Sequence, residues 1–115
     1  METLNAVLAL EALAQATRLG IFRKLVEAGP GGFAAGEIAE KMDLPAPTLS
    51  FHLAQLKHAG LIACRRDGRS LFYSADFAAM NELVAFLTDN CCSGDAARCV
   101  PASRASQPKP KRRTA

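Results

Sequence analysis

Residues 44–62 have the sequence LPAPTLSFHLAQLKHAGLI and decide the fold of this chain. Within them, Leu49, Leu53 and Leu56 recur at helical spacing and form one apolar stripe. Pro47 suits the first turn of a helix, where its missing N–H costs nothing, and the glycine after the stripe is a usual helix stop. We therefore predict a helix that packs its leucines inward.

The face opposite the leucines is unusual for a merely solvated surface. Short hydroxyls and an amide can reach phosphates and base edges, and Phe51 can touch a thymine methyl in a major groove. We interpret this stretch as a DNA recognition helix, although an ordinary amphipathic helix also fits the leucines. His52 can contact DNA, or it can be a partly buried histidine that is hydrogen-bonded to the backbone. The candidate DNA contacts on the helix are Pro47, Thr48, Ser50, Phe51, His52 and Gln55.

A basic turn follows the helix. Asp-Gly lies between the strand-like runs 61–64 and 71–74, which is a strong hairpin signal. The turn carries Arg65, Arg66 and Arg69, which we expect to contact DNA. In this interpretation Cys64, which lies within the first of these runs, is a small buried hydrophobe. A helix that leads directly into a hairpin with a basic tip is a winged helix-turn-helix layout.

Composition limits the remaining possibilities. A chain of 115 residues, half of them apolar, forms one folded domain, and no apolar run approaches the length of a membrane span. The acidic N-terminus lacks the features of a secretion signal, so we expect a cytoplasmic protein. Residues 98–115 carry six basic side chains and no acid, so residues 1–97 carry −3 of the net +3. Any DNA contact of this acidic body must be local.

Four other helices are expected around the recognition helix. The first has one apolar side, made by Leu4, Val7, Leu8 and Ala12. The second starts at about Thr17 as N-cap, the third spans Ala35–Met42, and the last runs from about Asp76 to Asn90. The predicted fold class is mainly α with a small β-hairpin, in the order α-α-α-α-β-β-α, a winged helix-turn-helix.

The two terminal helices are too apolar to stand alone. We expect them to pair across a two-fold axis in a homodimer, which gives two recognition helices for one palindromic site. The alternative is that both complete a monomer core. With the homodimer, residues 1–90 are the predicted DNA-binding and dimerisation domain and residues 91–99 a cysteine segment. Residues 100–115 are rich in Pro, Ser and basic residues, and we expect them to form a disordered tail.

The chain resembles the ArsR/SmtB family of small dimeric metal-responsive repressors over about residues 13–87. Four motifs carry the resemblance together: AQATRLGIF at 14–22, EIAE at 37–40, PTLSFHL at 47–53 and AGLI at 59–62. The chain departs from the family pattern at Pro45 and Ala46, where a hydroxyl cap and Gln are common, and at Phe51, where a basic residue is common. These departures reduce direct base contacts from the first turn, so specificity would lean more on DNA shape.

Three cysteines lie at the end of the last predicted helix: Cys91, Cys92 and Cys99. Adjacent residues in a helix point about 100° apart, so the first two can share one ion only if the helix frays there. Three thiolates suit a soft ion such as trivalent arsenic or antimony, whereas zinc prefers a fourth ligand. Within the family, this placement resembles arsenical sensors with a vicinal pair near the end of the last helix. The resemblance thus implies As(III) or Sb(III) as inducer, with no constitutive cofactor.

These observations predict an arsenite-responsive transcriptional repressor that binds operator DNA as a homodimer. One alternative is a thiol redox or persulfide sensor of the same fold, and another is a module whose helix face binds a protein. The cysteines can also be incidental, or form a Cys92–Cys99 disulfide. The sequence shows no catalytic constellation, so we do not expect an enzyme.

Overall fold

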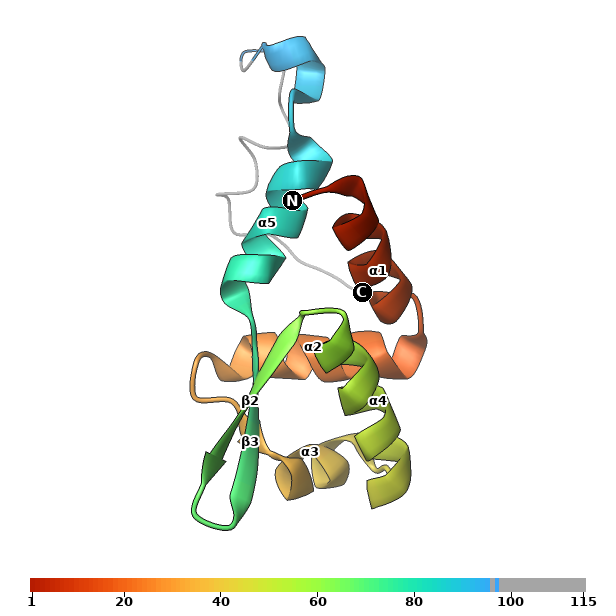
Figure 1. The fold of residues 1–115 in the computed structure, drawn as a ribbon, viewed down its shortest axis with the longest axis vertical. Coiled ribbons are helices and arrows are strands. Elements are labelled where there is room, and N and C mark those ends of the chain that lie inside the picture. Colours follow the sequence, from red (N-terminus) through yellow and green to blue (C-terminus); the bar gives the residue numbers. More distant parts are fainter. Residues whose placement is uncertain (96, 98–115) are drawn as a thin grey trace.

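The structure, a computed structural model, describes residues 1–95 and 97. Figure 1 shows a helical body from which a β-hairpin projects. The described elements in chain order are α1 (Thr3–Leu13), α2 (Ala16–Ala28), β1 (Phe33–Ala34), α3 (Ala35–Met42), α4 (Ala46–His58), β2 (Ile62–Asp67), β3 (Ser70–Ala75), α5 (Phe77–Thr88) and the short 3₁₀ helix η1 (Cys91–Gly94). This order confirms the predicted winged helix-turn-helix and adds one short strand, β1.

The helix-turn-helix forms because α2, α3 and α4 bury one side each in a common core. Leu49, Leu53 and Leu56 of α4 are all buried, as the leucine stripe predicted. Ile38 fills the same core from α3, whose bounds match the predicted helix. Burial of such side chains contributes about 1.5–3 kcal/mol each, so the stripe fixes α4 against the body and leaves its other side outward.

The helix caps differ in part from the prediction. Helix α2 is capped by Gln15, whose side-chain oxygen accepts a hydrogen bond from the Arg18 backbone N–H at 2.8 Å, so the expected cap at Thr17 is wrong. An amide two residues upstream satisfies the same free donors. Helix α5 is capped by Asp76, which accepts from the Ala79 N–H at 3.0 Å and confirms the predicted start.

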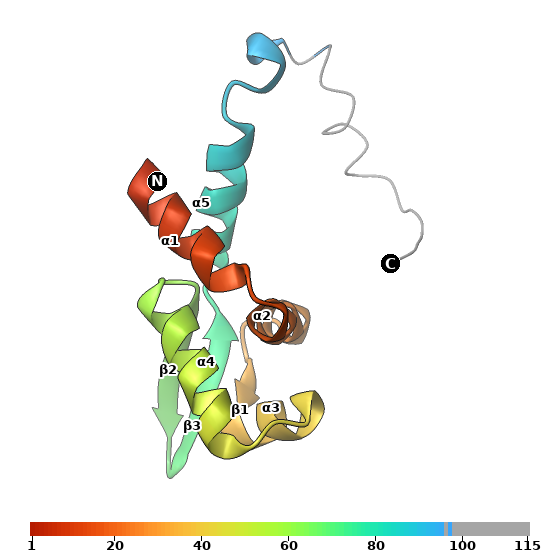
Figure 2. The ribbon, with the colours of Figure 1, turned by 90° about the vertical axis from the view of Figure 1, so that its right-hand side faces the viewer.

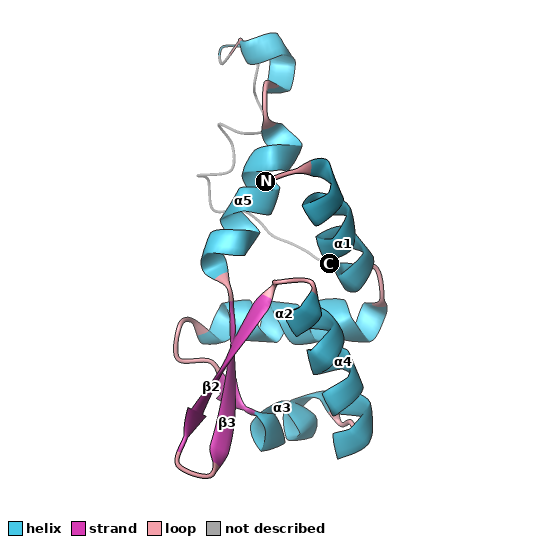
Figure 3. Cartoon of the chain, viewed as in Figure 1, coloured by secondary structure: helices cyan, strands magenta, loops and turns pink. Residues whose placement is uncertain are grey.

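The sheet has three antiparallel strands in the order β1-β3-β2. Asp67 pairs with Ser70, so the hairpin loop is Gly68-Arg69, and the first two arginines of the predicted turn belong to β2. Gly68 has φ +65°, which suits a tight two-residue loop. Figure 3 shows the hairpin beside α3 and α4. We call the β2–β3 hairpin the wing.

The terminal helices leave much of their apolar surface outside the core of the single chain. Helix α1 buries its alanines, Ala6, Ala9 and Ala12, so only Ala12 of the predicted apolar side lies in this core. Small residues face the body because α1 then packs closely on its neighbours. Six large apolar side chains of α1 and α5 are exposed: Leu4, Val7, Leu8, Leu10, Val84 and Leu87. Helices α1 and α5 lie side by side, as Figures 1 and 2 both show.

Candidate nucleic-acid interface and cysteine segment

Helix α4 presents most of the predicted contact residues to solvent. Phe51 is 57% exposed, an unusual position for a large aromatic ring. The exposed members of the predicted set are Pro47, Thr48, Ser50, Phe51 and Gln55. Gln55 also lines a cavity of about 210 Å³ with Glu11 and Arg18, so it lies toward α1 rather than at the far edge of the helix.

His52 does not belong to this exposed set. Its side chain is 8% exposed, and its Nδ1 lies 3.3 Å from Nη1 of Arg18 on α2. The ring is therefore occupied in the contact between α2 and α4, which argues against the predicted base contact. The second interpretation, a partly buried histidine, fits the burial, although the partner is a side chain and not backbone.

Sequence reasoning missed the role of Arg18. Its Nε donates to the Ala12 carbonyl oxygen at 2.8 Å, and its Nη1 reaches His52, so one guanidinium links the end of α1 to α4. The only sequence signal was its place in the motif at 14–22. A contact between residues 34 positions apart leaves no local pattern.

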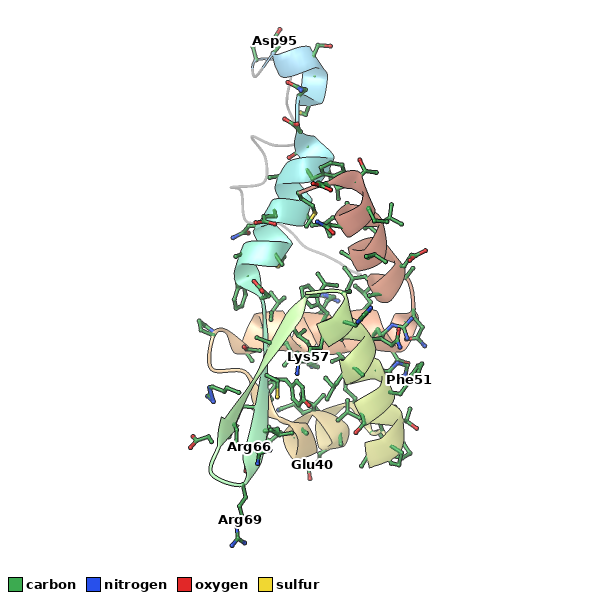
Figure 4. All side chains as sticks on the ribbon, viewed as in Figure 1. Glu40, Phe51, Lys57, Arg66, Arg69 and Asp95 are labelled. Atoms are coloured by element: carbon green, nitrogen blue, oxygen red, sulfur yellow. The ribbon has the colours of Figure 1, made fainter. Side chains whose placement is uncertain are left out.

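The three wing arginines are not equivalent. The guanidinium of Arg65 lies 4.7 Å from the centre of the Phe72 ring, and its Nη2 is 3.4 Å from the Gly31 carbonyl oxygen. Arg65 therefore links β2 to β3 within the wing and also contacts the loop that precedes β1. All three arginines are exposed, and Figure 4 shows Arg69 pointing away from the tip of the wing.

The base of the wing contains a second unexpected contact. Cys64 is half-buried, not fully buried as predicted, and pairs with Tyr73 across β2 and β3. Burial raises the pKa of the Tyr73 hydroxyl above 10.0, and a hydrogen bond between the Cys64 and Tyr73 side chains and the charge of the Cys64 thiolate raise it further. Burial and the contact with Cys64 thus both favour the neutral phenol over the phenolate.

The first turn of α4 and the tip of the wing lie at the same end of the molecule in both Figure 1 and Figure 2. The two elements differ in charge. Helix α4 has no charged side chain from Ala46 to Gln55, while the tip of the wing carries Arg66 and Arg69. A neutral helix and a basic ribbon on one side are an arrangement that fits a groove flanked by phosphates.

The cysteine segment lies at the opposite end, beyond α5 (Figure 1). Regular helix ends at Thr88, and Asn90, Cys92 and Ser93 all have positive φ. Because the chain leaves the helical path, the Sγ atoms of Cys91 and Cys92 come within 3.7 Å of one another. Cys99 and the predicted disordered tail lie outside the described residues, within which no group of three or more His, Cys, Asp or Glu side chains could hold a metal ion.

Comparisons with known proteins agree with this geometry. A family model described as a helix-turn-helix domain matches residues 13–65. The HTH-type transcriptional regulator YgaV of Escherichia coli is 34% identical over 88 residues, which cover 76% of this chain and 87% of that protein. HlyU from Vibrio cholerae has a similar solved structure, with a TM-score of 0.60, 33% identity, and coverage of 76% of this chain and 97% of that one.

A second solved structure carries the family name. It is the homodimeric winged helix-turn-helix DNA-binding domain of Mb0332 from Mycobacterium bovis, a possible ArsR-family transcriptional regulator. Its TM-score is 0.59 at 29% identity, and the match covers 79% of this chain and 84% of that domain.

This chain belongs to the ArsR/SmtB family. The matched region spans about half the length, 53% and 52%, of two other curated relatives. Family members share the winged fold described above, and the family resemblance noted in the sequence is confirmed. Among the described residues, every helix is too short or too polar to cross a membrane.

Proposed function

We propose that this ArsR/SmtB protein is a homodimeric transcriptional repressor, released from operator DNA when As(III) or Sb(III) binds its cysteine thiolates. One observation carries the proposal. The two elements suited to DNA, α4 and the wing, lie at one end of the molecule, while a close vicinal thiol pair follows α5 at the other. Such a separation fits a regulator in which inducer and DNA occupy different sites.

The exposed apolar side chains of α1 and α5 support a homodimer. Leu4 is 66% exposed, Val84 54% and Leu87 59%, and they come from two helices that lie side by side. A patch of large apolar side chains at this scale is typical of a protein–protein interface. A two-fold axis through this surface places two α4 helices on one side, and the relative Mb0332 is described as homodimeric.

DNA binding would divide between the two elements. The first turns of α4 would enter a major groove, as the second helix of a helix-turn-helix does, and the wing would lie over the neighbouring backbone. In a palindromic site, the two helices must be about 34–36 Å apart to enter successive major grooves. Arg66 and Arg69 would supply the phosphate contacts, because the body of the chain is acidic.

The cysteine geometry supports the binding of one thiophilic ion. The Sγ atoms of Cys91 and Cys92 are 3.7 Å apart, close enough for both thiolates to bind one ion with little movement of the chain. This closeness depends on the end of α5 at Thr88, as the fraying argument required. Cys99 would complete a three-sulfur set around a trivalent arsenical.

Release of DNA would follow from the link between η1 and α5. When Cys99 joins an ion held by Cys91 and Cys92, the chain after α5 closes on itself and changes how that helix ends. Because α5 belongs to the proposed dimer surface, the two subunits would shift and move their α4 helices out of register. A coupling of about 1–3 kcal/mol lowers affinity roughly 5–150-fold, which is enough to derepress.

A thiol redox or persulfide sensor is the second candidate, because Cys92 is exposed and accessible to an oxidant. The oxidised pair would be Cys99 with Cys91 or Cys92. A disulfide between neighbours is unfavourable, since adjacent Cα atoms are about 3.8 Å apart and disulfides need roughly 4.4–6.8 Å. This candidate needs only two cysteines, whereas the arsenite site uses three.

Fluorescence anisotropy of the full chain on DNA from upstream of its own gene tests both candidates. We expect arsenite to release the DNA without dissociating the dimer, and Cys91→Ser or Cys92→Ser to abolish the response. Cys99→Ser should spare the response to a monomethylated arsenical, which offers only two bonds to sulfur. The matched control is Cys64→Ser, which should respond like the wild type.

The outcomes separate the candidates. If peroxide or sulfide releases DNA and arsenite does not, the redox candidate replaces the arsenite one. If a Cys91→Ser, Cys92→Ser double variant still responds to arsenite, the proposed site is wrong. If the dimer ignores the DNA at low salt, the repressor proposal fails as a whole.

A further inference from the structure

The centre of the exposed face of α4 is apolar. Residues advance by about 100° along a helix, so the line opposite the buried leucines passes through Pro47, Phe51, Ala54 and His58. Phe51 and Ala54 are both exposed in the middle of this line. The two residues that would stand closest to base edges in the second turn therefore offer carbon atoms and not polar groups.

The same face lacks the side chains that recognise guanine. Arg and Lys make the commonest specific contact, with guanine O6 and N7, yet the first cation on α4 is Lys57 in its last turn. The side chains that are present suit A·T pairs. Phe and Ala, and the methyl of Thr48, pack on the thymine C5-methyl, and Gln55 can pair with adenine.

The ring of Phe51 is held in place from below. It meets the His52 ring edge-to-face, with centroids 5.6 Å apart and an angle of 65° between planes. His52 is buried and is itself contacted by Arg18, whose Nε is bonded to Ala12. A chain of contacts thus positions an aromatic ring that is 57% exposed, so little freedom remains to be lost when the ring meets an apolar group.

We propose that Phe51 is a specificity-determining residue that packs on a thymine C5-methyl, and that the operator half-site has A·T pairs where the first turns of α4 lie. This inference rests on the proposed DNA binding and names the chemistry of the base that α4 selects. The methyl is the one apolar feature of the major-groove edge, and its loss leaves base pairing unchanged.

The test uses full-length wild-type dimer and duplexes enriched from a random pool by binding to it. In the best duplex, deoxyuridine replaces thymidine at one symmetric pair of positions at a time, and anisotropy gives the Kd. Removal of the methyl beneath Phe51 should weaken binding about fourfold per half-site, or about 15-fold for both, as expected for one buried methyl. Other thymidine positions should change less.

Variants assign the effect to the ring. Phe51→Ala should bind the thymidine and deoxyuridine duplexes with equal affinity within about twofold, while Phe51→Leu should keep part of the difference because it keeps apolar contact. Phe51 is on the surface, so neither change should unfold the domain. Leu19→Ala removes an exposed apolar side chain on α2 and should retain the full difference.

The outcomes of this test separate the inference about Phe51 from the DNA-binding proposal. If the enriched half-sites have G·C pairs under α4, or if no thymidine is sensitive to loss of its methyl, the inference is overturned while the repressor proposal stands. The same holds if Phe51→Ala keeps the wild-type difference. If the dimer enriches no duplex, the DNA-binding proposal itself fails, and the exposed ring belongs to another partner.

Discussion

Helix α4 and the wing lie on the same side of the molecule, but the helix surface is neutral and the wing is basic. The helix is neutral through three turns and is fixed to the body by three buried leucines, whereas the exposed part of the wing carries three arginines and one acid: Arg65, Arg66, Arg69 and Asp67. Charge acts on every phosphate alike, while neutral groups distinguish one base edge from another. The comparison suggests that affinity resides mainly in the wing and sequence preference mainly in the helix.

The two elements also differ in how they are anchored. Helix α4 is part of the core, but the wing is joined to the body through β1, through the contact of Arg65 Nη2 with the Gly31 carbonyl oxygen, and through the strand β3 that leads into α5. A substitution that loosens the attachment of the wing should therefore change DNA affinity first. A substitution in the contacts beneath α4 should change both the stability of the domain and its selectivity for DNA sequence.

The largest effect is expected at Gly32, which precedes β1. Its φ is +67°, and an added Cβ would lie 2.0 Å from the Tyr73 carbonyl oxygen, so Gly32→Ala must push β1 away from β3. We expect a loss of about 3 kcal/mol in the free energy of unfolding, because backbone strain and a backbone clash act together. Urea denaturation at neutral pH measures it.

Gly31→Ala is the matched control for this change. Gly31 has nothing within 4 Å of the added Cβ, and its φ is not positive, so stability should change by less than about 0.5 kcal/mol. Equal effects of the two substitutions would contradict the assigned role of β1 in holding the wing.

Next in size is the guanidinium beneath α4. Arg18→Gln leaves the Ala12 carbonyl and the His52 Nδ1 without their donor, which should cost about 1–3 kcal/mol of stability. It should also reduce the preference of Phe51 for thymidine over deoxyuridine, because His52 no longer holds the ring. Arg23→Gln, on the exposed side of α2, removes the same charge and should do neither.

The next prediction concerns the exposed charges of the wing, which should affect DNA affinity and not sequence preference. Arg66→Ala and Arg69→Ala should each weaken binding about tenfold at moderate salt and by similar factors on all duplexes. Each should reduce the slope of log affinity against log salt by about one per subunit, since one phosphate contact is lost. Phe51→Ala should leave that slope unchanged. A wing variant that alters sequence preference but not the slope would contradict the assignment of affinity to the wing and of sequence preference to α4.

The sequence was sufficient for the regular parts of this molecule. The leucine stripe of α4, the bounds of α3, the start of α5 near Asp76 and the Asp-Gly hairpin each depend on local patterns, and the structure has all of them. The burial of His52 and the inward alanines of α1 depend on contacts with distant segments. A period of 3.6 locates an apolar side but cannot say whether the body or another subunit covers it.

The candidate site divides in the same way. Exposure of Phe51 and Arg69 followed from the helix face and the hairpin tip, while the contact of Arg65 with the Phe72 ring depends on the register of the two strands. For the cysteines, geometry required that regular helix not continue through Cys91 and Cys92 if they share an ion; α5 ends at Thr88, and the two Sγ atoms are 3.7 Å apart. The metalloid itself stays a prediction.

The smallest effect concerns Tyr73, which joins the two strands at the base of the wing. Burial, followed by the hydrogen bond and charge of Cys64, raises the pKa of its hydroxyl above 10.0. A group whose pKa is raised on folding adds stability that is fully present below its unfolded pKa and is lost as pH rises through the folded value. The pairing of the two wing strands should therefore weaken only in strongly alkaline solution.

The chain has one tyrosine and no tryptophan, so phenolate absorbance reports Tyr73 alone. The midpoint should exceed 10.0 in the folded protein and return to about 10 in concentrated guanidinium. Cys64→Ala should lower the midpoint while leaving it above 10.0, because burial is the larger cause. A folded protein that titrates at 10.0 with or without Cys64 would show that the phenol is neither buried nor bonded to Cys64, and that Tyr73 does not help to hold β2 and β3 together.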